Sequence, residues 1–122
     1  MTQAARSIQI YGFYLLVSGF AMCFVPNAML GSLGVAPTTE GYIRMLGLVL
    51  GIIALYYLVA ARTQVVAFFR WTVWGRGLAV VGVLGLIIGG FAPKEFLGTA
   101  LLDAASAIWT ALALRRIPAA AA

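Results

Sequence analysis

Four hydrophobic segments alternate with short polar connections along the chain, over residues 8–25, 42–61, 71–91 and 96–114. Each approaches the ~20 residues that an α-helix needs to cross a hydrocarbon core of ~30 Å. None shows the strict two-residue alternation of a membrane β-strand. Because backbone groups in lipid must be hydrogen-bonded within their own segment, all four are predicted as α-helices. The pattern predicts an all-α, polytopic membrane protein with four transmembrane helices in an up-down bundle.

Two parts of this pattern allow more than one interpretation. The first segment follows Arg6, as in a signal peptide, but its apolar run is longer than such a region requires, so we interpret it as a retained helix. The stretch TQVVAFFRW, residues 63–71, mixes aromatic and basic residues. It is expected to form either a short interfacial helix or an inward extension of the third span. The apolar connection 26–41 is expected to lie at the outer interface.

Composition supports the membrane assignment. Of the 122 residues, 64% are hydrophobic and 9% are charged, whereas about a quarter of residues in soluble domains are charged. We therefore expect one membrane domain covering residues 1–122. The chain has no histidine and one cysteine, Cys23, so histidine-ligated metals, histidine acid–base catalysis and an internal disulfide are excluded. With only three carboxylates besides, we expect no metal site and no cofactor.

The basic residues are distributed unevenly between the two predicted faces of the membrane. Six lie toward one side, before the first span, around the connection between the second and third spans, or after the fourth: Arg6, Arg62, Arg70, Arg76, Arg115 and Arg116. The other side has Arg44 and Lys94, accompanied by Glu40 and Glu95. The positive-inside rule then predicts an N-in/C-in, multi-pass protein of the bacterial inner membrane. The net charge of +5 is attributed to lipid headgroups as counter-charges, and no nucleic-acid partner is expected.

Aromatic residues fall toward both ends of the predicted spans, which is typical of interfacial belts. The inner group is Tyr11, Tyr14, Tyr56, Tyr57, Phe68, Phe69, Trp71, Trp74 and Trp109, and the outer group is Phe24, Tyr42, Phe91 and Phe96.

Small residues recur at four-residue spacing, which allows helix backbones to approach closely in lipid. The pairs are Gly47 with Gly51 in the second span and Gly85 with Gly89 in the third, followed by alanines in the fourth. We predict that these residues pack helices within the chain, with a homo-oligomer interface as a second possible use.

One acidic residue, Asp103, lies inside the fourth span. Helical spacing places it on one face with Thr99, Ser106 and Thr110, so the face must point into the bundle or a wet cavity. The candidate partners are Arg44 and Arg76. With 1.5 Å of rise per residue, Asp103 lies ~10 Å below the outer end of its span and Arg44 ~3 Å below the outer end of its own.

Depth favours Arg44 as the partner. Arg76 enters from the cytoplasmic side, is separated from Asp103 by ~10 Å vertically, and is expected to extend toward the cytoplasm. Arg44 also shares a helical face with Gly47 and Gly51. We therefore predict an Arg44–Asp103 pair that is structural, with a proton or cation site at Asp103 as the alternative.

Three motifs resemble those of uncharacterised small four-helix bacterial membrane proteins: YIRMLGLVLG, WGRG and LLDAASA. The resemblance covers most of the chain and implies no catalytic residues. Two other small families do not fit. The first span lacks the glutamate of small multidrug exporters, and the asparagine and paired-phenylalanine pattern of fluoride channels is missing.

The leading hypothesis for function is a non-enzymatic one, an accessory or scaffolding subunit that packs against another membrane protein or a second copy. No nucleophile–base pair, phosphate loop or metal-ligand spacing points to an enzyme. The alternative is a small oligomeric transporter or channel with Asp103 and Arg44 at its site. A third hypothesis is lipid or quinone binding in the aromatic cytoplasmic half.

Overall fold

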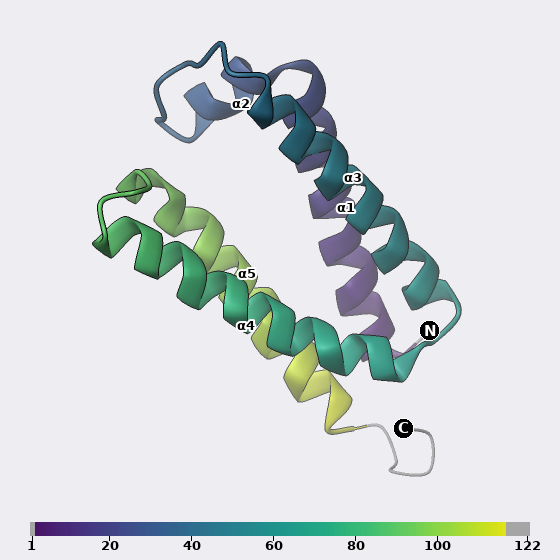
Figure 1. Ribbon diagram of the computed structural model, residues 1–122. Helices are drawn as coiled ribbons and strands as arrows, with labels where there is room; N and C mark the ends of the chain where they lie inside the picture. The colour runs from purple at the N-terminus through teal and green to yellow at the C-terminus, as the bar shows by residue number, and fades with distance from the viewer. Residues whose placement is uncertain (1, 117–122) are drawn as a thin grey trace.

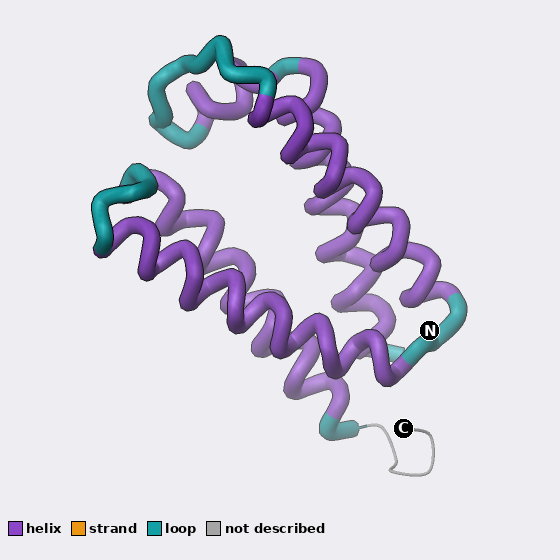
Figure 2. Tube along the Cα trace, viewed as in Figure 1, coloured by secondary structure: helices purple, strands orange, loops and turns teal. Residues whose placement is uncertain are grey.

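The computed structural model describes residues 2–116, and the described chain is all-α. The helices are α1 (Gln3–Phe24), α2 (Pro26–Ser32), α3 (Tyr42–Arg62), α4 (Val66–Ile88) and α5 (Leu97–Leu114), with a 3₁₀ turn, η1 (Lys94–Phe96), before α5. Figure 2 shows the helices connected by loops, with a short turn after α5. Four helices, namely α1, α3, α4 and η1–α5, are long and apolar enough to cross a membrane. The prediction of an all-α chain with four such spans is confirmed.

Two helices begin earlier than the hydrophobic segments that predicted them. Helix α1 begins at Gln3 because the Thr2 hydroxyl accepts a hydrogen bond from the amide of Ala5, at 3.1 Å, and caps the first turn. Helix α4 begins at Val66, so the stretch 63–71 mostly extends the third span. At its other end, α4 stops at Ile88, before the predicted 91, since Gly90 adopts a φ of +79° that ends the helix.

The connection after α1 contains a short helix, α2. Pro26 lies in its first turn, where the missing amide costs no hydrogen bond. The loop that follows is held back against α2, because the Thr38 amide donates to Oδ1 of Asn27 at 2.8 Å. The same loop approaches η1 at Gly34, where an added Cβ would lie 3.7 Å from Cγ of Glu95.

The four spans pair into two helical hairpins that diverge from one end (Figure 1). Helix α1 packs along α3, and α4 packs along α5, while smaller contacts from α1 to α5 and α4 join the hairpins. The α3–α4 connection and both ends of the described chain lie at the joined end. The helices open into a wedge and do not close into the predicted compact bundle.

The joined end of the wedge has an apolar core of small side chains around one phenylalanine. Phe69 is fully buried there, and its neighbours are Ala4, Ala5, Ile8, Ala60, Ala61 and Ala113. Alanines let the backbones of α1, α3, α4 and α5 meet closely, which is how helices associate in a lipid environment that supplies no hydrophobic drive.

The α1–α3 hairpin is packed backbone to backbone through glycines. A Cβ added to Gly47 would lie 2.5 Å from the amide nitrogen of Cys23, and one added to Gly19 would lie 2.7 Å from the carbonyl oxygen of Gly47. The Cβ added to Gly19 would also lie 2.7 Å from the amide nitrogen of Gly51. By contrast, a Cβ at Gly85 would meet no atom within 4 Å, and one at Gly89 would meet only Phe91 and its own helix.

Candidate functional site

Asp103 is bound by a tyrosine from the other hairpin. It lies in the middle of α5, and its Oδ1 accepts a hydrogen bond from the hydroxyl of Tyr11 on α1, at 2.7 Å. Tyr11 is buried, whereas Asp103 is half-buried. The bond therefore joins the two hairpins just where they begin to separate.

Arg76 on α4 occupies the centre of the polar cluster and is only 2% exposed. Its Nε donates to the Thr72 carbonyl at 3.2 Å, and its Nη1 donates to Oγ of Ser106 at 3.1 Å. Its Nη2 donates to two hydroxyls, Oγ1 of Thr72 at 3.0 Å and Oγ1 of Thr110 at 2.9 Å. Four hydrogen bonds from one guanidinium account for the burial of a charge that lipid would otherwise exclude.

Tyr11 connects the two charged side chains. The Arg76 guanidinium carbon lies 4.7 Å from the centre of the Tyr11 ring, within range of a cation–π interaction, while the Tyr11 hydroxyl bonds to Asp103. Tyr11 therefore lies between the arginine and the carboxylate, in contact with both. We call Ser7, Tyr11, Thr72, Arg76, Asp103, Ser106 and Thr110 the polar network.

Hydroxyls complete the polar network. Ser7 of α1 and Thr110 of α5 have their oxygens 2.7 Å apart and share a hydrogen bond. The Ser106 hydroxyl donates to the Asp103 carbonyl, and the Thr110 hydroxyl donates to the Ser106 carbonyl at 3.1 Å. No buried side-chain nitrogen or oxygen within residues 2–116 lacks a hydrogen-bond partner. Such a satisfied cluster is stabilising where a partly satisfied one would not be.

The predicted polar stripe of α5 is divided by the structure. Asp103, Ser106 and Thr110 belong to the polar network, but Thr99 donates to the carbonyl of Phe96 at 2.7 Å and stabilises the first turn of α5. Thr99 is half-buried and lies one turn from Asp103 toward the open end of the wedge.

The predicted partner of Asp103 requires correction. Arg44 donates to the carbonyl of Cys23 at 2.7 Å, and more weakly to that of Phe24, at the end of α1. It thus binds the exposed carbonyls of a helix C-terminus, where a cation is favoured. The structure does not bring Arg44 and Asp103 together, because α3 packs against α1 and not against α5.

Arg76 does not extend toward the cytoplasm as predicted, because Ser106 and Thr110 supply hydrogen-bond acceptors at its own depth. Tyr11 then spans the remaining distance to Asp103. A signal was present in the spacing of the sequence, since Ser7 and Tyr11, and likewise Thr72 and Arg76, are four residues apart on their helices.

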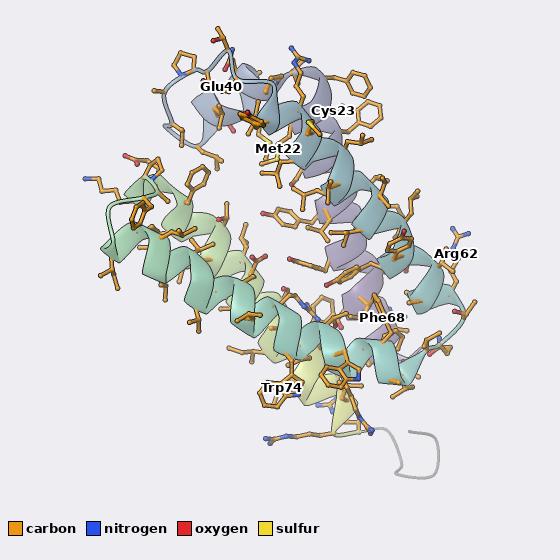
Figure 3. The ribbon with its side chains drawn as sticks, viewed as in Figure 1. Met22, Cys23, Glu40, Arg62, Phe68 and Trp74 are labelled. Atoms are coloured by element: carbon orange, nitrogen blue, oxygen red, sulfur yellow. The ribbon has the colours of Figure 1, made fainter. Side chains whose placement is uncertain are left out.

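The inner aromatic residues do not all form a belt. Tyr11 packs against Tyr14 and Tyr57, with ring centres 5.8 and 5.4 Å apart, and Tyr57 in turn packs edge-on against Phe68 at 5.3 Å. These rings surround the polar network. Trp71 and Trp74 are exposed, as belt residues should be, and Trp74 projects from α4 away from the α1–α3 hairpin (Figure 3).

A groove of about 300 Å³ runs between α1 and α5 beside the polar network. Its walls are Ile10 and Tyr14 on one helix, and Leu102, Ala105 and Trp109 on the other. Three residues belong to both the groove and the polar network: Ser7, Tyr11 and Ser106. The groove is almost entirely apolar, so it suits a hydrocarbon chain or a neutral ring.

The chemistry that these groups offer is polar contact and charge pairing. Within residues 2–116, no three His, Cys, Asp or Glu side chains gather into a metal-binding group. The one acid in the site, Asp103, accepts a hydrogen bond from Tyr11 at Oδ1 and is half-buried. No family model, curated protein or solved structure matches the chain.

Proposed function

We propose that the chain is a non-enzymatic, accessory subunit of a larger membrane assembly, with both termini on the cytoplasmic side of a bacterial inner membrane. In this role the wedge between the α1–α3 and α4–α5 hairpins receives a transmembrane segment of a partner protein. The polar network fixes the joined end of the wedge and leaves the helix faces beyond it to the partner.

The proposal is supported by the limited contact between the two hairpins, which leaves most of each hairpin uncovered by the other. Helix α3 packs against α1, and α4 packs mainly against α5. The hairpins meet through the apolar core and the polar network at the joined end, and the loop after α2 approaches η1 at Gly34 at the other end. Asp103 lies inside a candidate span and is only half-buried, so this chain leaves part of a polar residue uncovered. A buried polar group of a second protein would compensate that exposure.

Site-directed photo-crosslinking tests the proposal in native membranes. A photoreactive residue in place of Thr99 lies on the Asp103 face of α5, whereas one in place of Leu101 lies on an exposed face of the same helix. We expect Thr99 to capture a protein of different sequence in a discrete adduct and Leu101 to capture lipid. If gentle extraction and crosslinking repeatedly give the lone chain or a symmetric oligomer, the accessory role is wrong.

A second function, transport of protons or a small cation, is favoured by the partial exposure of Asp103 alone. Arg44 has no part in that site, because it is bound at the end of α1. Proton and potassium flux into liposomes, measured with the purified chain, tests this alternative. Flux that Asp103→Asn abolishes while the helical content is retained would support transport, and flux that survives would remove Asp103 from the mechanism.

A further inference from the structure

Five exposed arginines gather at the joined end of the two hairpins. They lie in the first turns of α1 and α4, at the last residue of α3 and directly after α5: Arg6, Arg70, Arg62, Arg115 and Arg116. Because α4 and α5 run antiparallel and pack along each other, the end of α5 lies beside the beginning of α4 (Figure 1). Arg70, Arg115 and Arg116 therefore form a cationic cluster on one hairpin, which we call the arginine cluster.

The chain supplies no acidic side chain at this end to balance the arginines. Its three acidic residues are Glu40 and Glu95, both at the opposite end, and Asp103, which Tyr11 binds. Within residues 2–116, the guanidinium hydrogen bonds are made by Arg44 and Arg76. Within residues 2–116 the arginine cluster therefore has no acidic partner, and anions of the surroundings can supply its counter-charges.

Two tryptophans place the arginine cluster at the surface of the hydrocarbon core. Trp71 and Trp74 are 74% and 75% exposed and lie within about one turn of Arg70 on α4. Exposed indole rings are enriched at the level of the lipid headgroups, where the anionic groups are phosphates. A soluble polyanion would not need large apolar rings beside the arginines.

We propose that the arginine cluster, with Trp71 and Trp74, binds the headgroups of anionic phospholipids in preference to zwitterionic ones. The phosphates accept hydrogen bonds from Arg70, Arg115 and Arg116, and the tryptophan rings lie against the glycerol and upper acyl regions of the same lipids. This binding does not rest on the accessory role, because it needs no partner protein and uses none of the polar network.

Tryptophan quenching by brominated lipid measures the preference directly. In a Trp109→Phe background the two remaining tryptophans of the chain are Trp71 and Trp74. The protein is reconstituted in vesicles of equal parts phosphatidylcholine and phosphatidylglycerol, with bromine on the acyl chains of one lipid or the other. We expect stronger quenching when phosphatidylglycerol carries the bromine. Equal quenching by the two brominated lipids would overturn the proposal.

Matched variants locate the site. Arg70→Gln is expected to lower the relative association constant for phosphatidylglycerol about fivefold, which corresponds to ~1 kcal/mol per arginine at a membrane surface. Lys94→Gln removes one charge at the opposite end and is expected to leave the constant unchanged. The triple variant Arg70→Gln, Arg115→Gln, Arg116→Gln should abolish the preference with helical content intact. A preference that persists in the triple variant, or that a soluble RNA oligonucleotide removes, would contradict the proposal.

Discussion

Arg76 is the residue whose role is hardest to anticipate and easiest to test. Its four hydrogen bonds use the planar fork of the guanidinium, which reaches acceptors on α4 and α5 at once. A lysine ammonium keeps the charge but cannot reproduce that geometry. Burial without those bonds is costly because a charged donor loses ~1.5–3 kcal/mol for each hydrogen bond removed.

We therefore expect Arg76→Lys to lower the free energy of unfolding in mixed micelles by about 2 kcal/mol. Arg70→Lys, on an exposed turn of the same helix, serves as the control and should change it by less than about 0.5 kcal/mol. Equal effects of the two substitutions would show that Arg76 does not make these contacts in the bilayer.

The sequence predicted which face of α5 is polar, but not what that face meets. Spacing alone grouped Asp103, Ser106 and Thr110, and the structure brings these three into one network. Tyr11 was assigned to the interface, because a tyrosine in a membrane helix is amphipathic and is most often found there. The four-residue spacing of Ser7 and Tyr11 places them on one face of α1, but it does not indicate that this face packs against α5.

Among the elements, the two GxxxG pairs show why an identical motif predicts packing in one helix only. Gly47 in α3 contacts the backbone of α1, whereas Gly85 in α4 faces open space. The motif permits a close approach of two helices but does not supply the second helix. For Gly47 the second helix is α1, which approaches through Gly19, a glycine outside any GxxxG pair.

Substitution by alanine is expected to affect Gly47 and Gly85 differently. Gly47→Ala places a carbon 2.5 Å from the Cys23 amide nitrogen, which backbone atoms can relieve only if α1 and α3 move apart. We expect a loss of about 2 kcal/mol in unfolding free energy, within the range for overpacking a core. Gly85→Ala meets no atom within 4 Å and should be neutral or slightly stabilising. Thermal unfolding in detergent compares them, and equal sensitivity would contradict the α1–α3 packing.

The helix boundaries were predictable only to within a turn or so. Hydropathy marks where a helix lies in hydrocarbon, but α1 and α4 both continue beyond it into turns that carry Arg6 and Arg70. The actual ends depend on local chemistry, such as the Thr2 hydroxyl at the start of α1 and the left-handed Gly90 after α4.

At the scale of the whole molecule, the structure is two hairpins joined at one end, and this arrangement had no signature in the sequence. Charge distribution and hydropathy are the same for a closed bundle and for an open wedge. The difference lies in which helix pairs make extensive contact, and this follows from the side chains where α1 crosses α3 and from the polar network at the joined end.

Cysteine crosslinking distinguishes the wedge from a closed bundle. In a Cys23→Ala background, Ser7→Cys with Thr110→Cys should form a disulfide on mild oxidation, since the two native hydroxyls are 2.7 Å apart. Ile43→Cys with Thr99→Cys, near the outer ends of α3 and α5, should not, because those helices do not pack together. Efficient crosslinking of the second pair would indicate that the hairpins close in the membrane.

The central claim is that Asp103 is held by Tyr11 of the opposite hairpin within a network centred on Arg76. The most direct measurement is a pair of double-mutant cycles on the free energy of unfolding, one combining Tyr11→Phe with Asp103→Leu and the other combining Arg44→Gln with Asp103→Leu. The structure predicts a coupling energy of about 1 kcal/mol for the first pair and about zero for the second. No coupling between Tyr11 and Asp103, together with clear coupling between Arg44 and Asp103, would contradict it.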